Sequence, residues 1–78
     1  MNTLVKNKPT KATKVWFADK KLFVLLEDGR EIAIPLEWFP KLRDASERQL
    51  NNWRFIGGGV GIHWEELDED LSVEGFLH

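Results

Sequence analysis

The sequence contains no cysteine and no tyrosine, and only three of its 78 residues are proline. Without thiols the chain can form neither a disulfide nor a thiolate-ligated metal site. No apolar run approaches the ~20 residues that a membrane-spanning helix needs. The first residues also lack the apolar core of a secretory signal. We therefore expect a cytoplasmic protein without a membrane partner.

A chain of 78 residues forms one small domain. A core of that size supplies only about 3–5 kcal/mol of net stability unless something else contributes. The four tryptophans and five phenylalanines are the expected compensation, because each large ring buries roughly 150–250 Å². Formation of a homodimer is the other common compensation, and the sequence leaves it open.

Positive charge is concentrated at the N-terminus. Residues 1–14 hold four lysines and no acid, whereas the rest of the chain is acidic and the formal net charge is −2. We expect residues 1–14 to form a flexible basic arm ahead of a single domain at residues 15–78. The alternative is an arm that binds nucleic acid, although it lacks interleaved aromatic residues.

Apolar and branched residues between positions 15 and 34 predict a three-stranded antiparallel meander, with strands over 15–18, 21–27 and 30–34. The middle strand is apolar on both faces, which indicates a central strand. Asp28 and Gly29 separate the last two strands and predict a two-residue hairpin turn in which both residues have positive φ.

Residues 44–53 are the best helix candidate. Either Asp44 with Glu47 or Ser46 with Gln49 would form a capping box at its start. The preceding connection, broken at Pro40, is expected to be irregular or a single helical turn. The fold class predicted from these patterns is α+β: a three-stranded antiparallel meander, one helix and a short C-terminal strand or turn in a single small domain.

Four glycines in five positions follow the helix candidate, which raises the question of a phosphate loop. A dinucleotide fingerprint needs a glycine at the sixth position, and counted from Gly57 that position is Ile62. A Walker loop needs a lysine, and none follows Lys41. The sequence therefore predicts no nucleotide cofactor. Gly57 and Gly59 are instead predicted to be turn residues that permit left-handed backbone.

His63 and Trp64 are predicted to be packed residues of a short strand. The spacing of His63 and Glu65 resembles the zinc deaminases, but the cysteine ligands of those enzymes are missing. A metal-dependent site formed by His63, Asp68 and Asp70 is the least favoured hypothesis. We predict no catalytic residue, no metal and no other cofactor.

An acidic run follows Trp64 and contains no basic residue. A calcium loop is not supported, because Val73 stands where such a loop requires glycine. The run is typical of a solvated face, and it is also suited to a basic protein partner, since complementary charge raises the association rate and selectivity. The predicted partner-binding residues are Glu65, Glu66, Asp68, Glu69 and Asp70.

Several spaced motifs together resemble a small bacterial family of domains of unknown function, the one numbered 2442. The resemblance extends from Val15 to Leu77, and Glu65 replaces the proline that usually follows the tryptophan. The motifs that carry it are D-G-R at 28–30, I-P-L at 34–36, I-H-W at 62–64, L-D-E-D at 67–70 and S-V-E-G at 72–75.

The resemblance implies a compact α+β domain with no established catalytic residue. Some members of that family are fused to a helix-turn-helix, and others are encoded beside another small protein, as in toxin–antitoxin pairs. We therefore expect a non-enzymatic protein-interaction module, an antitoxin-like or regulatory member of a gene pair, whose partner is a basic protein from a neighbouring gene. A nucleic-acid-binding regulator that uses the basic arm is the alternative.

Overall fold

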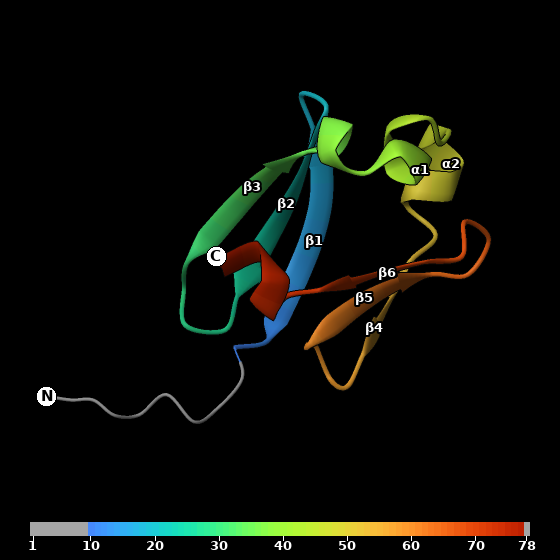
Figure 1. Ribbon diagram of the computed structural model, residues 1–78. Coiled ribbons are helices and arrows are strands. Elements are labelled where there is room, and N and C mark those ends of the chain that lie inside the picture. The colour runs from blue at the N-terminus through green and yellow to red at the C-terminus, as the bar shows by residue number, and fades with distance from the viewer. Residues whose placement is uncertain (1–9, 78) are drawn as a thin grey trace, which may run out of the picture.

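The computed structural model describes residues 10–77 and arranges them as two antiparallel three-stranded sheets joined by short helices (Figure 1). The first sheet has the order β1-β2-β3 and the second has the order β4-β5-β6. The strands are β1 (Ala12–Ala18), β2 (Lys21–Leu26), β3 (Glu31–Pro35), β4 (Arg54–Ile56), β5 (Gly61–Trp64) and β6 (Glu69–Ser72).

The first sheet confirms the predicted meander, with β2 in the centre. Leu22, Val24 and Leu26 of β2 point to one face and are fully buried or nearly so. Phe23 lies on the other face, which is only half-buried, and its ring stacks on Trp16 with the centroids 5.5 Å apart. The outer face of the sheet is therefore covered by its own aromatic side chains.

The two hairpins of this sheet use different turns. Asp19 and Lys20 have φ values of 50° and 60°, which makes the β1–β2 connection a two-residue turn with left-handed backbone at both positions. In the β2–β3 connection Gly29 has a φ of 96°, whereas Asp28 is not left-handed. The prediction of two positive φ values at Asp28-Gly29 was therefore wrong. The Asp28 carboxylate instead accepts a bond from the Arg30 N–H at 3.0 Å.

β1 begins at Ala12, three residues before the predicted Val15. Its start is fixed by two backbone hydrogen bonds, from the Ala12 N–H to the Gly59 carbonyl and from the Glu27 N–H to the Lys11 carbonyl, each 2.8 Å long. The end of the predicted basic arm is thus part of the first sheet. Residues 1–9 of that arm lie outside the described residues.

Within residues 10–77 the helical structure consists of four short elements, and the helix predicted over residues 44–53 is reduced to the single turn of α2. Ser46 and Gln49 form the capping box of α2, with the Gln49 N–H bonded to the Ser46 hydroxyl at 3.1 Å. The helix nevertheless ends after one turn, because Leu50 and the residues after it turn toward the second sheet. The helical elements are η2 (Leu36–Trp38), α1 (Pro40–Arg43), α2 (Glu47–Leu50) and η3 (Glu74–Leu77).

The second sheet corrects the prediction of one short C-terminal strand. β4, β5 and β6 form a full antiparallel meander in which Ile62 pairs with both Phe55 and Leu71. The acidic residues Glu69 and Asp70 lie within β6, where the sequence indicated a solvated run. The acidic residues made this strand hard to predict, because Leu71 is the one buried residue of β6.

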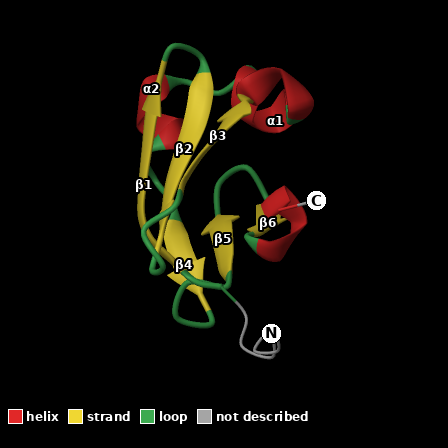
Figure 2. Cartoon of the chain, turned by 90° about the vertical axis from the view of Figure 1, so that its left-hand side faces the viewer, coloured by secondary structure: helices red, strands yellow, loops and turns green. Residues whose placement is uncertain are grey.

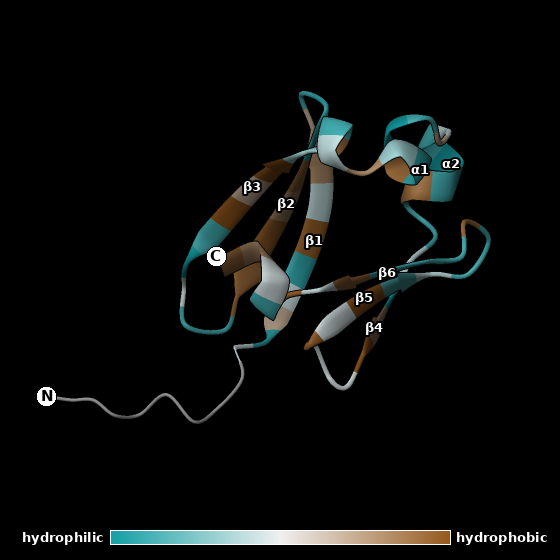
Figure 3. Cartoon of the chain, in the orientation of Figure 1, coloured by the Kyte–Doolittle hydropathy of each residue, from teal (hydrophilic) through white to brown (hydrophobic). Residues whose placement is uncertain are grey.

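One apolar core joins the two sheets, and its side chains come from both of them. Figure 3 shows hydrophobic segments along β2 and β5. Figure 2 shows α1 and α2 at one end of the molecule and the C-terminal helical turn η3 beside β6. Trp64 is fully buried at the end of β5, and its indole N–H donates to the Leu50 carbonyl at 2.9 Å. That bond ties the second sheet to the end of α2.

Candidate functional site

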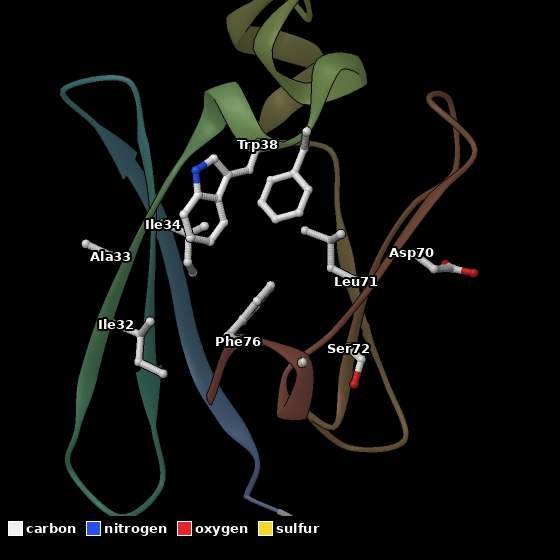
Figure 4. Close-up of a pocket in the computed structure, with 10 residues that line it drawn as sticks. Ile32, Ala33, Ile34, Trp38, Asp70, Leu71, Ser72 and Phe76 are labelled. Atoms are coloured by element: carbon white, nitrogen blue, oxygen red, sulfur yellow. The ribbon is translucent and has the colours of Figure 1, made fainter. Parts of the chain in front are cut away.

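An apolar groove of about 350 Å³ lies between β3 and β6, the last strands of the two sheets (Figure 4). Its ends are closed by η2 and its C-cap on one side and by η3 on the other. The lining residues are Ile32, Ala33, Ile34, Trp38, Phe39, Asp70, Leu71, Ser72, Gly75 and Phe76.

Aromatic rings form one end of this groove. Phe39 and Phe76 meet edge to face with their ring centroids 6.4 Å apart. Trp38 lies beside them and is 70% exposed, the largest exposure of any big hydrophobic residue described. Pro40 at the first position of α1 suits a helix start, and Phe39 is the N-cap residue before it. The sheets thus leave an apolar surface uncovered.

The predicted acidic site extends from the β5–β6 turn to Asp70 at the groove, and most of its carboxylates contact cations of the same chain. Glu66 accepts hydrogen bonds from Arg48 at 3.1 and 3.2 Å and from Gln49 at 3.0 Å. The Arg48 bonds, followed by the Gln49 bond, lower the pKa of the Glu66 carboxyl. This cluster fastens the β5–β6 turn to α2.

His63 lies between two of the predicted acids. Its Nδ1 contacts the Asp70 carboxylate across the strand pair, and its Nε2 lies 3.2 Å from Glu65. The hydrogen bond to Asp70 and the nearby charge of Glu65 raise the pKa of the imidazole, although partial burial opposes the rise. The His63 side chain is 17% exposed. Asp70 lines the groove, but its carboxylate points away from the groove and contacts His63.

The remaining two acids are held differently. Lys41 donates to the Asp68 carbonyl at 3.1 Å, and its Nζ lies 3.9 Å from the Glu69 carboxylate. Asp68 itself has a φ of 52° in the turn, a conformation that aspartate and asparagine tolerate better than most residues. Its carboxylate is exposed.

The structure brings His63 and Asp70 together but does not place Asp68 with them. Within residues 10–77, no group of three or more histidine, cysteine, aspartate or glutamate side chains is arranged to hold a metal ion. The hypothesis of a metal site at those three residues therefore gains no support from the geometry.

The predicted turn glycines lie in the β4–β5 connection with left-handed backbone. Gly57 has a φ of 63° and Gly59 a φ of 121°. At Gly59 an added Cβ would lie 2.5 Å from the Ala12 carbonyl oxygen. The glycine at 59 thus lets the second sheet approach the start of β1, and its role is structural.

Sequence reasoning missed the groove. Its residues come from positions 32–39 and 70–76, and nothing in either segment marks them as neighbours. The one available signal was Trp38, a large aromatic residue between two prolines in a segment without strand or helix periodicity. A tryptophan in such a connection has no obvious core position.

Residues 12–78 match the model of a family described as a protein of unknown function, DUF2442. The chain belongs to this family. The resemblance found in the motifs is thereby confirmed, and the DUF2442 match includes β1 from its first residue. No curated protein matches the chain.

A solved structure with the same fold supports the architecture of this DUF2442 domain. It is a protein of unknown function from Rhodospirillum rubrum ATCC 11170, determined by crystallography at 2.75 Å resolution. The two chains are 35% identical, the match covers 90% of this chain and 87% of that chain, and the TM-score is 0.77. Because the match covers most of each chain, it supports a single small domain.

The described part of the chain, residues 10–77, includes no helix that is long and apolar enough to cross a membrane.

Proposed function

We propose that this DUF2442 domain is a non-enzymatic protein-interaction module, the antitoxin-like or regulatory member of a gene pair, that binds a basic protein. The observation that carries the proposal is the apolar groove between β3 and β6 with Trp38 exposed at its end. Exposed apolar surface of this kind marks interaction sites, and tryptophan is enriched among the residues that dominate binding energy.

The lining of the groove favours a protein over a small molecule. Small-molecule sites combine an apolar wall with a few convergent polar side chains that fix the ligand. Here the polar side chains of the lining are those of Asp70 and Ser72, and the Asp70 carboxylate points away from the groove toward His63 (Figure 4). An apolar wall without such groups suits the side chains of another protein.

The acidic β5–β6 hairpin supplies the second part of the proposal. Most of its carboxylates already contact a cation of this chain, so they contribute less to a new ion pair than the sequence suggested. The exposed Asp68 carboxylate remains available for long-range attraction. Charge of this kind chiefly raises the association rate with a basic partner.

The test is co-expression of the tagged protein with its genomic neighbour, followed by native mass spectrometry at low salt. We expect a stoichiometric complex that Trp38→Ala weakens at least tenfold. Trp16→Ala is the matched control, because Trp16 lies on the outer face of the first sheet, stacked on Phe23. Equal loss in both variants, or no complex at all, would contradict the proposal.

A second variant pair tests the charge. Asp68→Asn and Asp19→Asn each remove one exposed carboxylate from a turn position with nearly the same φ, 52° and 50°. We expect Asp68→Asn alone to slow association, and to do so less at high salt, because salt screens exposed charges. Identical association rates for both variants would show that the acidic hairpin does not face the partner.

A further inference from the structure

We infer that the partner enters the groove as an extended segment that adds to the open edge of β3 as a fourth strand of the first sheet. This inference rests on the proposed function and names how the partner is held. Three features carry it: the direction of the free backbone groups of β3, the apolar wall beside them, and the charge at the ends of the groove.

The register of the β2–β3 ladder determines which backbone groups of β3 are free. Beyond one end of the ladder the Leu26 N–H donates to the Arg30 carbonyl at 2.8 Å, and beyond the other the Leu36 N–H donates to the Lys20 carbonyl at 3.0 Å. The pairs Leu26–Arg30 and Lys20–Leu36 thus continue the register of the β2–β3 residue pairs that lie between them. In an antiparallel ladder, hydrogen-bonded pairs alternate with pairs that are not bonded to each other.

It follows that Ile32 and Ile34 exchange hydrogen bonds with β2, whereas the N–H and carbonyl groups of Glu31 and Ala33 point away from the sheet. No other strand of the described chain pairs with β3 at this edge. Exposed edges with free backbone groups are templates for strand addition. Pro35 has no N–H and sets the end of the usable edge.

The apolar wall lies beside this edge. Side chains alternate between the two faces of a strand, so every second residue of an added segment would point to the same side as Ile32 and Ile34. That side meets Trp38, Leu71 and Phe76 across the groove. A segment with apolar residues at alternate positions therefore fits both the backbone edge and the wall.

Charge at the groove indicates what flanks those apolar residues. Glu31 precedes the lining residue Ile32, and Glu74 precedes the lining residue Gly75. Neither carboxylate forms an ion pair within residues 10–77, and the lining includes no lysine or arginine. The expected segment thus has lysine or arginine beside its alternating apolar residues, which agrees with a basic partner.

The probe is a phage-displayed library of random decapeptides selected on the full chain. We expect selected peptides to alternate apolar residues and to carry lysine or arginine. Ala33→Pro removes the outward N–H while leaving the bonds to β2 in place, since proline is tolerated at strand edges. Loss of one hydrogen bond should weaken peptide binding about five- to tenfold. Ala33→Ser keeps the N–H and is expected to bind within about twofold of the parent.

Amide hydrogen exchange provides a readout that does not depend on a variant that folds. In the free protein the Ala33 amide should exchange fast and the Ile32 and Ile34 amides slowly. Peptide binding should slow the Ala33 amide at least tenfold while leaving Ile34 unchanged. An Ala33 amide that exchanges equally fast with and without saturating peptide would overturn the inference.

Other outcomes separate this inference from the proposed function. Peptides that bind Ala33→Pro like the parent but bind Trp38→Ala weakly would overturn strand addition and leave the interaction module standing. Peptides whose affinity is unchanged by both substitutions, or a selection that enriches no peptide, would overturn the groove as a docking site. A dimer in solution that Ala33→Pro dissociates would assign the β3 edge to a second copy and overturn the assignment to a partner.

Discussion

The two sheets of this DUF2442 domain are held together in different ways. Strands of the first sheet contain five to seven residues, and its central strand β2 alternates buried with less buried positions. Strands of the second contain three or four residues, and their surface is a set of ion pairs. The first sheet is specified by its own local pattern, whereas the second depends on Trp64, on the glycine turn and on contacts with other elements.

The difference extends to function. The outer face of the first sheet is covered by the stacked rings of Trp16 and Phe23, and its free edge at β3 borders the groove. The second sheet contributes the opposite wall and most of the acidic surface. Neither sheet forms the groove alone, so the candidate site exists only where two differently stabilised halves meet.

The largest effect is expected from Trp64→Ala. Trp64 is fully buried and donates to the Leu50 carbonyl, so its truncation leaves a large cavity and an unpaired acceptor. We expect a loss of about 3–5 kcal/mol in the free energy of unfolding, which is as much as a core of this size supplies. Urea denaturation is therefore measured in the presence of a stabilising osmolyte. Because both sheets share one core, the transition should remain single, and the first sheet should not persist by itself.

Trp38→Ala is the matched control for that measurement. Trp38 is 70% exposed, so its truncation should change the free energy of unfolding by no more than about 0.5 kcal/mol. A biphasic transition in Trp64→Ala, with the first sheet unfolding later, would show that the two sheets unfold as separate units.

A smaller effect is expected at the junction of the sheets. In Gly59→Ala the new Cβ would meet the Ala12 carbonyl oxygen at 2.5 Å, and the φ of 121° is itself strained for alanine. We expect a loss of about 2–3 kcal/mol from strain and displacement of β1. Gly29→Ala has a φ of 96° and open space around the new Cβ, so strain alone should cost it about 1 kcal/mol. Equal losses in thermal melts would refute a tight junction.

The sequence predicted the first sheet because its information is local. Alternation of apolar residues and an Asp28-Gly29 turn signal lie within the segment that forms the meander. Even there the turn type was wrong, since a three-residue loop places only Gly29 in the left-handed region. The two-residue left-handed turn occurs instead at Asp19-Lys20, where the residue types gave a weaker signal.

The second sheet and the groove were not predicted because their determinants are tertiary. From its sequence, β6 resembles a solvated acidic surface. In the structure Asp70 contacts His63, and Glu69 lies beside Lys41. Likewise α2 has the helix start that the capping box predicts, but contacts with the second sheet end it after Leu50. Sequence patterns identified the acidic residues. The groove could not be predicted from them, because it depends on the packing of β3 beside β6.

Ser46→Ala tests the connection between the sheets. The Ser46 hydroxyl accepts a hydrogen bond from the Gln49 N–H, and the Gln49 Oε1 accepts one from the Ser46 N–H at 2.9 Å. Loss of such a cap costs about 1 kcal/mol, which urea denaturation can resolve. Ser72→Ala, at an exposed position of β6, is the control with an expected change below about 0.5 kcal/mol. Similar values for both would mean that α2 adds little to holding the sheets together.

The smallest expected effects concern the pH dependence of stability, which should have opposite signs in the two sheets. In the first sheet, the hydrogen bonds from Arg30 lower the pKa of Asp28. The contribution of the Asp28 carboxylate to stability is therefore complete above its pKa in the unfolded chain, about 3.9. That contribution is lost as the pH falls through its pKa in the folded protein. Asp28→Asn should consequently lower the melting temperature at neutral pH and approach the parent in acid.

In the second sheet the sign is reversed. The contact with Asp70 raises the pKa of His63, so its contribution is complete below the unfolded value of about 6.5 and is lost as the pH rises through the folded pKa. Melting curves from pH 5.5 to 9 should show the parent losing its advantage over His63→Gln as the pH rises, and Asp70→Asn should remove the same dependence. Parallel curves for the parent and His63→Gln would show that the pair does not stabilise the sheet. The second sheet would then contribute no pH dependence in this range, and the contrast between the two halves would rest on their packing and on Asp28.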